Sequence, residues 1–394
     1  MDLFDKCKNF TRAKEIMALG MYPYFRAIQS GPGSEVMIDN KMKIMIGSNN
    51  YLGLTGHPKV VEAAKNAIDK YGTGCTGSRY LNGTLDIHVE LEERLAKFIK
   101  REKVLCFTTG HQSNQGAISA IIGKNDIVFT DRADHASIVD GYRLSFGKIK
   151  KYRHNDMEDL ERCLESEKDT DAGKLIVTDG VFSMEGDIVD LPKLVELAKK
   201  YNTRVYVDDA HSVGVLGKHG RGTAEHFGLE GQIDLSMGTF SKSFASVGGF
   251  VAGDENVIDY IKHFARSLIF SASPPPASVA TVIACLDILE AEPERLEMLW
   301  KNTRKMHEGF RSLGFNTGHS ATPIIPIKIG SDEDCFGFWK LMFENGIFAN
   351  PAISPAVPPG EAIIRTSFMA THTDEELDKV LEIFGKLGKQ FGII

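Results

Sequence analysis

The sequence lacks several features that mark particular classes of protein. Its six cysteines are scattered and form no C-x-x-C pair, which argues against a zinc site or a disulfide framework and favours free thiols in a reducing cytosol. No apolar run approaches the roughly 18 residues that a membrane span requires. The N-terminus has no basic-then-apolar signal pattern. We therefore expect a cytoplasmic protein without a transmembrane segment.

Concentrated positive charge is also missing. The chain has 46 basic and 53 acidic residues, a formal net charge of −7, and no basic block. Because nucleic-acid surfaces need clustered Lys and Arg, we expect no nucleic-acid partner. The P-loop pattern G-x-x-x-x-G-K-[ST] and the zinc pattern H-E-x-x-H are both absent. Asp208 and His211 have no further ligands at helical spacing nearby, so we expect no metal ion.

Short apolar runs dominate the centre of the chain, and helical segments separate them. Such alternation predicts a mostly parallel sheet with helices on both faces, an α/β fold. The expected strands are residues 104–107, 127–129, 175–177 and 205–207, and the helices include residues 58–70, 88–100, 114–122 and 194–201.

The two ends of the chain have a different pattern of helices and strands. A helix over residues 6–19 and a hairpin around Asp39-Asn40-Lys41 suggest an N-terminal arm. After residue 290 a long helix, two strands and a final helix predict a smaller α+β domain. At 394 residues the chain is long enough for these parts: an arm (1–45), a large domain (46–290) and a C-terminal small domain (291–394).

The most informative segment is Thr239-Phe240-Ser241-Lys242-Ser243. A lysine between hydroxyl residues is usually a solvated surface residue, but Asp208 and His211 change this interpretation. Both follow the apolar run 205–207, which reads as a buried strand. A carboxylate at a strand end and a later lysine suit pyridoxal phosphate, because the carboxylate pairs with the pyridine nitrogen and the lysine forms a Schiff base.

Two further segments favour an anionic ligand. Thr109-Gly110-His111 follows one expected strand and precedes a helix, and helix N-termini attract phosphate; an ordinary helix cap is the alternative. His135 follows another strand, where it either caps a ligand ring or is an ordinary loop residue. Gly72–Gly77 matches G-x-G-x-x-G, but an expected helix precedes it, so an NAD-dependent oxidoreductase is only a remote alternative.

Taken together, these residues resemble the α-oxoamine synthases, a family of fold-type-I pyridoxal-phosphate transferases. The resemblance covers nearly the whole chain. Its markers are residues 47–54 (GSNNYLGL), 134–137 (DHAS), 179–187 (DGVFSMEGD), 208–214 (DDAHSVG), 220–222 (GRG) and 239–242 (TFSK).

The resemblance implies a role for each candidate residue and a homodimer with active sites at its interface. Lys242 would bind the cofactor and remove the α-proton, Asp208 would pair with the ring nitrogen, His211 with the ring oxygen, and His135 would stack on the ring. The implied cofactor contacts also include Gly110, His111, Thr239, Ser241 and Ser183, with Ser271 and Ser273 reaching the neighbouring subunit's phosphate. The implied substrate contacts are Asn50, Tyr51, His135 and Arg365.

Within the family, two segments resemble the serine palmitoyltransferase branch: Tyr22–Arg26 and Gly77–Thr84. That branch joins L-serine to a long-chain acyl-CoA (palmitoyl-CoA), releasing CoA and carbon dioxide and forming 3-oxosphinganine, the first step of sphingolipid synthesis. Glycine C-acetyltransferase and 8-amino-7-oxononanoate synthase stay open as alternatives, because acyl-chain selectivity depends on the shape of a pocket.

Overall fold

The computed structural model describes residues 2–394 of the chain. Contacts divide the chain into two compact units, one formed by residues 49–183 and 187–299 and the other by residues 1–48, 184–186 and 300–394. The division into an arm, a large domain and a small domain at residues 45 and 290 stays a prediction. Among the described residues, no helix combines the length and apolar content that crossing a membrane requires.

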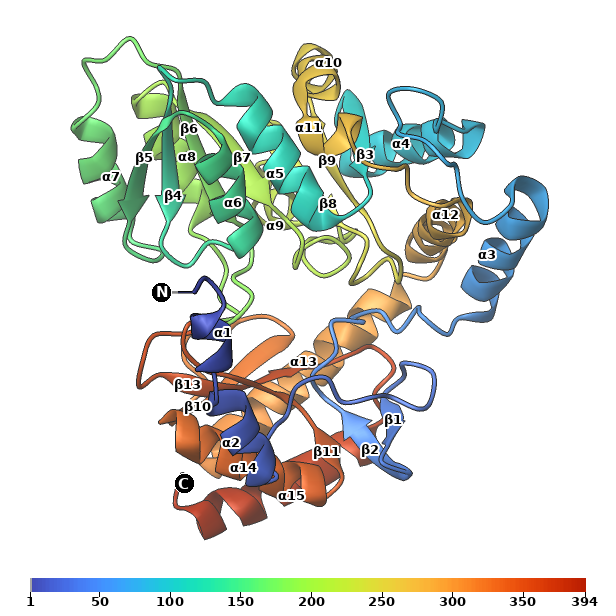
Figure 1. The fold of residues 1–394 in the computed structure, drawn as a ribbon, viewed down its shortest axis with the longest axis vertical. Helices are drawn as coiled ribbons and strands as arrows, with labels where there is room; N and C mark the ends of the chain where they lie inside the picture. The colour runs from blue at the N-terminus through green and yellow to red at the C-terminus, as the bar shows by residue number, and fades with distance from the viewer. Residues whose placement is uncertain (1) are drawn as a thin grey trace. The chain divides into compact units, whose positions relative to one another are not determined.

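The larger unit is an α/β structure built on seven strands (Figure 1). Its strands are β3 (Lys103–Phe107), β4 (Ile127–Asp131), β5 (Lys148–Tyr152), β6 (Lys174–Asp179), β7 (Arg204–Asp208), β8 (Leu235–Thr239) and β9 (Gly249–Gly253). Its helices are α3 (Pro58–Tyr71), α4 (Asp86–Ile99), α5 (Gly110–Ile121), α6 (Ala136–Leu144), α7 (Met157–Glu165), α8 (Leu191–Lys200), α9 (Thr223–Phe227), α10 (Glu255–Phe264), α11 (Arg266–Ile269) and α12 (Pro276–Ala291).

The strand order in this sheet is β3-β9-β8-β7-β6-β4-β5. Strand β9 is antiparallel to β3 and β8, whereas the run from β8 to β5 is parallel throughout. The predicted mostly parallel sheet is therefore confirmed. Parallel strands place their carboxyl ends on one edge, where α/β sheets bind ligands.

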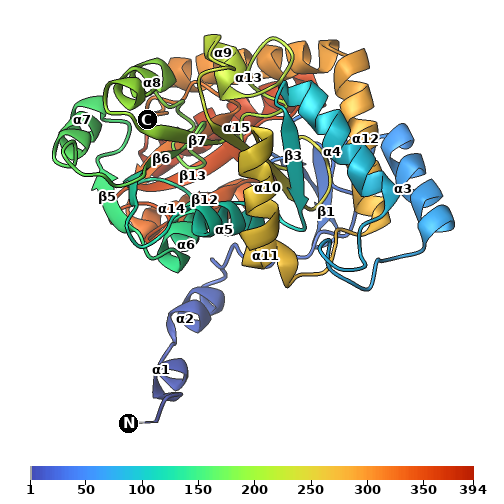
Figure 2. The same cartoon turned by 90° about the horizontal axis from the view of Figure 1, so that it is seen from above.

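Helices cover both faces of the sheet, as predicted (Figure 2). In β7, Tyr206 packs toward the α5, α6 and α10 side, and Val205 and Val207 pack toward the α7 and α8 side. Each strand alternates in this way because successive side chains point to opposite faces. Both faces are buried, which explains why the strands read as continuous apolar runs.

The smaller unit has two three-stranded sheets, β1-β2-β11 and β10-β13-β12. Their strands are β1 (Glu35–Ile38), β2 (Lys41–Met45), β10 (Ile324–Gly330), β11 (Ile347–Phe348), β12 (Asn350–Ala352) and β13 (Ala362–Ser367). The remaining helices are α1 (Asp5–Lys8), α2 (Arg12–Ala18), α13 (Glu294–Leu313), α14 (Asp332–Glu344) and α15 (Asp374–Phe391). The predicted hairpin is present, with Asp39 and Asn40 at positive φ in its two-residue loop.

Three local features differ from the sequence-based expectation. The single helix over residues 6–19 is two short helices, since Asn9 caps the end of α1 and Thr11 precedes α2. Helix α5 starts at Gly110, four residues early, because the Thr109 side chain accepts a hydrogen bond from the Gln112 N–H. Strands β5, β8 and β9 were not predicted, because lysines dominate the first and small residues the other two.

Candidate functional site

Three strands of the larger unit end in polar residues at the same edge of the sheet. Asp179 closes β6, Asp208 closes β7 and Thr239 closes β8. Asp179 is the direct partner of Asp208 in the ladder, and Asp208 pairs with Met237 in β8. The strand register therefore brings two carboxylates side by side at the edge where a ligand is expected.

The Asp208 carboxylate is buried and held in place by neighbouring donors. Its Oδ2 accepts a hydrogen bond of 2.6 Å from Asn114 Nδ2, and its Oδ1 accepts one of 2.8 Å from the Ala210 N–H. Asn114 Oδ1 accepts in turn from the Tyr206 hydroxyl at 2.8 Å. These bonds fix the direction of the carboxylate before any ligand arrives.

His135 is the N-cap residue of α6, and its backbone N–H donates to Asp179 Oδ2 at 2.8 Å. The residue is exposed, and its ring is held by Ser137, whose hydroxyl lies 2.7 Å from Nδ1. Desolvation by the surrounding protein lowers the pKa of His135, the nearby Asp208 carboxylate opposes this shift, and the Lys242 ammonium adds to it. The net shift therefore favours the neutral form of the imidazole.

Lys242 lies in the loop between β8 and β9 and is partly buried. Its ammonium also acts on Asp179: burial and the Asp208 and Asp134 charges raise the pKa of Asp179 well above its usual value, and Lys242 opposes the rise. Lys242 is thus in electrostatic contact with His135 and Asp179. The structure brings the predicted lysine, aspartate and histidine to one place.

The N-terminus of α5 forms a narrow cradle beside Thr239. A Cβ added to Gly110 would lie 2.6 Å from Thr239 Oγ1, so only glycine fits there. Thr239 Oγ1 and Ser241 Oγ are 3.0 Å apart. Exposed helix N–H groups next to two hydroxyls suit a phosphate, so the residues present fit the anionic end of pyridoxal phosphate. Asp208 fits its ring nitrogen.

The remaining predicted cofactor residues have varied surroundings. His111 is exposed and its Nε2 lies 3.1 Å from Asp140 Oδ2. Ser271 Oγ accepts from Gln112 Nε2 at 3.0 Å, which places it beside the first turn of α5. Ser273 Oγ is buried and has no hydrogen-bond partner within residues 2–394. Ser183 is partly buried in the loop after β6. Their roles stay predictions.

Two predicted substrate residues lie in the larger unit and are buried. The Tyr51 hydroxyl is 2.7 Å from His211 Nδ1, so the two side chains orient one another. Asn50 bonds to the Leu54 N–H and to Thr55 Oγ1. Arg365 belongs to the smaller unit, where it is buried in β13 opposite Pro326 of β10.

The glycine-rich loop Gly72–Gly77 does not have the context of a dinucleotide site. Gly72 is the C-cap of helix α3, and the next regular element is helix α4, so no strand leads into the motif. Within residues 2–394, no three His, Cys, Asp or Glu side chains are arranged as metal ligands.

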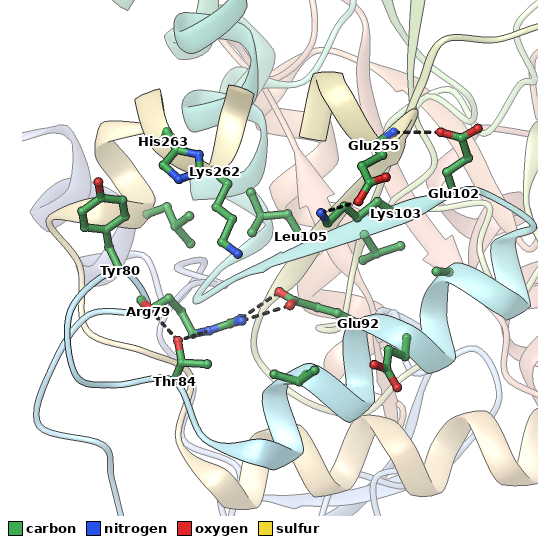
Figure 3. A pocket seen from close by; sticks show the side chains of 15 residues that line it. Arg79, Tyr80, Thr84, Glu92, Glu102, Lys103, Leu105, Glu255, Lys262 and His263 are labelled. Carbon is green, nitrogen blue, oxygen red and sulfur yellow. Dashed lines mark hydrogen bonds and ion pairs between the residues drawn. The ribbon is translucent and has the colours of Figure 1, made fainter. Parts of the chain in front are cut away.

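A cavity of about 780 Å³ lies elsewhere in the larger unit, between α4, α10 and the loop before α4 (Figure 3). Arg79 and Glu92 form a bidentate ion pair in its wall, at 2.8 and 3.0 Å. Tyr80 and His263 contact edge to face at its rim. None of the predicted site residues lines it.

Sequence reasoning missed four members of the site: Asn114, Ser137, Asp179 and Tyr206. Ser137 and Asp179 stand within segments that carried the family resemblance, next to residues that were singled out. Asn114 and Tyr206 look like an ordinary helix residue and an ordinary strand residue, and no local pattern separates them from the core.

Comparisons with known proteins agree with this geometry. The family model "Aminotransferase class I and II" matches residues 41–384. The chain is 53% identical to a serine palmitoyltransferase of Sphingobacterium spiritivorum, covering 98% of this chain and 97% of the relative. A serine palmitoyltransferase variant from S. paucimobilis, solved with a bound PLP–myriocin aldimine, is 36% identical with a TM-score of 0.97 and 100% coverage of both chains.

A second group of relatives is less similar. An 8-amino-7-oxononanoate synthase of Thermoanaerobacter pseudethanolicus is 45% identical, covering 97% of both chains.

Proposed function

Since the chain belongs to the class I and II aminotransferase family, we propose that it is a pyridoxal-phosphate-dependent acyltransferase that condenses L-serine with a long-chain acyl-CoA. With palmitoyl-CoA the products are 3-oxosphinganine, CoA and carbon dioxide. One observation carries the proposal: Asp208, His135 and Lys242 gather at one sheet edge, in a chain that is similar over its full length to serine palmitoyltransferases.

Each polar group at that edge of the sheet would bind a different part of the cofactor. The N–H groups of the first turn of α5, with Thr239 and Ser241, would hold the phosphate. The Asp208 carboxylate would keep a proton on the pyridine nitrogen, because an ionised partner in a dry site raises the basicity of that nitrogen. When bound, pyridoxal phosphate supplies an electron sink for the bonds broken at the α-carbon of the amino acid.

The protein's own residues then handle protons and substrate. Lys242 Nζ would remove the α-proton of serine and later return one. The neutral His135 ring would lie against the cofactor without adding charge. Arg365 offers a planar guanidinium for the serine carboxylate, a pairing that favours two parallel hydrogen bonds.

We further propose a homodimer in which Ser271 and Ser273 reach the neighbouring active site. A group of exposed apolar side chains on α10, at the end of α11 and in the loop before α4 supports an interface. We call it the aromatic patch; it consists of Tyr80, Leu81, Tyr260, Phe264 and Phe270. Tyr260 and Phe264 stack with their ring centroids 4.4 Å apart, and Tyr80 contacts His263 of the same helix. Exposed apolar side chains that gather in this way mark protein–protein contacts. The patch adjoins the cavity of Figure 3, which Tyr80 also lines.

A substrate panel tests the activity. We expect the catalytic efficiency to be highest for serine with palmitoyl-CoA and to fall with octanoyl- and acetyl-CoA, because each methylene buried in an apolar groove contributes up to roughly 0.8 kcal/mol. Preference for glycine with acetyl-CoA would assign the protein to glycine C-acetyltransferases. Preference for alanine with pimeloyl donors would assign it to 8-amino-7-oxononanoate synthases.

A further inference from the structure

Asn114 is a fully buried residue that bonds directly to Asp208 and is linked to His135 through Ser137. It lies on α5 with 0% of its surface exposed. Its Nδ2 donates to Asp208 Oδ2 at 2.6 Å and to Ser137 Oγ at 2.8 Å, and its Oδ1 accepts from Tyr206 Oη at 2.8 Å. The side-chain amide is therefore saturated: both hydrogens and the oxygen have partners.

The chemistry of these partners allows one orientation of the amide. Turning it over would place the amide oxygen 2.6 Å from a carboxylate oxygen, two acceptors with no proton between them. The Nδ2 group must therefore face Asp208. Tyr206 then has to donate its hydroxyl proton to Asn114, which locks the amide against the sheet.

This orientation also decides the proton of Ser137. The Ser137 oxygen accepts from Asn114, so its own hydrogen points to the other close partner, His135 Nδ1 at 2.7 Å. The Ser137 backbone N–H also approaches Nδ1, at 3.2 Å. Two donors thus meet His135 Nδ1, which must be an acceptor. The neutral ring carries its proton on Nε2.

We propose that Asn114 is a positioning residue that sets two features at once, the direction of the Asp208 carboxylate and the Nε2–H tautomer of His135. The proposal rests on the proposed function, because it assigns these two groups to the pyridine ring and the substrate. The Asn114 amide would then orient both Asp208, which faces the ring nitrogen, and His135, which covers the ring.

The tautomer is measurable without cofactor or turnover. In cofactor-free full-length protein labelled with ¹⁵N-histidine, long-range ¹H–¹⁵N correlations report which ring nitrogen carries the proton; the His135→Gln spectrum assigns the signal. We expect Nε2–H in the native protein. In Ser137→Ala the tautomer should become mixed, because the hydroxyl donor is gone. An Nδ1–H ring in the native protein would overturn the proposal.

Measuring cofactor affinity separates the effect of Asn114 on Asp208 from its effect on the His135 tautomer. Asn114→Leu should both change the His135 tautomer and weaken pyridoxal phosphate binding about tenfold or more, because Asp208 loses a charge-assisted hydrogen bond. Ser137→Ala should leave that affinity within about threefold of native. The matched control is Asn302→Leu, since Asn302 is equally buried but bonds to the carbonyls of Met369 and His372 in the smaller unit. Asn302→Leu should change neither the His135 tautomer nor the affinity for pyridoxal phosphate.

A failure of the proposed function can be told apart from a failure of the proposed role of Asn114. If native protein does not bind pyridoxal phosphate, the proposed function is rejected while the tautomer measurement still decides the role of Asn114. If Asn114→Leu does not fold, the native and Ser137→Ala spectra decide it. An unchanged His135 tautomer in Ser137→Ala would overturn the proposal that Asn114 acts on His135 through the Ser137 hydroxyl.

Discussion

At the scale of single residues, the site depends on groups whose protonation the surrounding protein controls. Desolvation lowers the pKa of His135, and burial together with neighbouring carboxylates raises the pKa of Asp179. The positive charge of Lys242 lowers the pKa of both residues. Perturbed groups that cluster at the carboxyl edge of an α/β sheet are typical of an active site.

Replacing the lysine tests its role directly. Lys242→Ala should abolish turnover and leave thermal stability nearly unchanged, because the side chain is only partly buried. Borohydride treatment of the native holoprotein should attach the cofactor to a single peptide containing Lys242, detected by mass spectrometry. Lys124→Ala, at an exposed position, is the control. Attachment to a different lysine would refute the assignment.

Replacing the ring partner should affect chemistry more than folding. In Asp208→Asn we expect α-proton exchange of serine to slow about a hundredfold, roughly 2.7 kcal/mol of barrier, because a neutral amide no longer favours a protonated ring nitrogen. The exchange of deuterium from solvent, followed by NMR, measures this step alone. Native exchange rates in the variant would show that Asp208 has another role.

At the scale of elements, a partly buried ion cluster links the loop after β6 to the end of β4. His154 Nδ1 lies 3.1 Å from Asp131 Oδ1 and its Nε2 lies 3.2 Å from Asp187 Oδ2. Burial disfavours the imidazolium, but the hydrogen bonds and charges of the two carboxylates outweigh it and raise the pKa of His154 to about 10. The loop that follows Asp179 is thereby tied to the sheet.

This cluster predicts a dependence of stability on pH. The folded pKa of about 10 exceeds the ordinary value of 6.5, so the contribution is complete below pH 6.5 and disappears as the pH rises through 10. We expect the free energy of unfolding to fall between pH 7 and 10 by up to about 1.4 kcal/mol per pH unit more than in His154→Gln. Urea titrations at several pH values measure it, with the exposed His319→Gln as control. Parallel curves for native protein and His154→Gln would contradict the prediction.

At the scale of the whole molecule, the aromatic patch predicts the oligomeric state. The native chain of 43.4 kDa should sediment at twice its mass. Phe264→Glu should shift it toward the monomer, because a charge placed in an apolar interface is costly to bury. Phe146→Glu changes a phenylalanine that is 84% exposed outside the patch and should leave the dimer intact. A native monomer at micromolar concentration would contradict the proposed interface.

The sequence by itself determined the fold class and the main candidates of the site. The apolar runs predicted four of the seven strands, since a strand buried on both faces needs apolar residues at every position. Asp208 was found because it directly follows such a run, and Lys242 because hydroxyl residues and glycines surround it. These signals are local, within a few residues of the chain.

Only the tertiary structure decided how the candidates are held. Asn114 and Asp208 are 94 residues apart in the chain, and Asn114 and Tyr206 are 92 apart. Their contacts follow from the register of β7 and from the packing of α5 against the sheet, and a local pattern encodes neither. The same applies to the bond between His135 and Asp179. Strand register is fixed by burial of whole faces, so the hydrogen bonds that orient the site appear only when the sheet has formed.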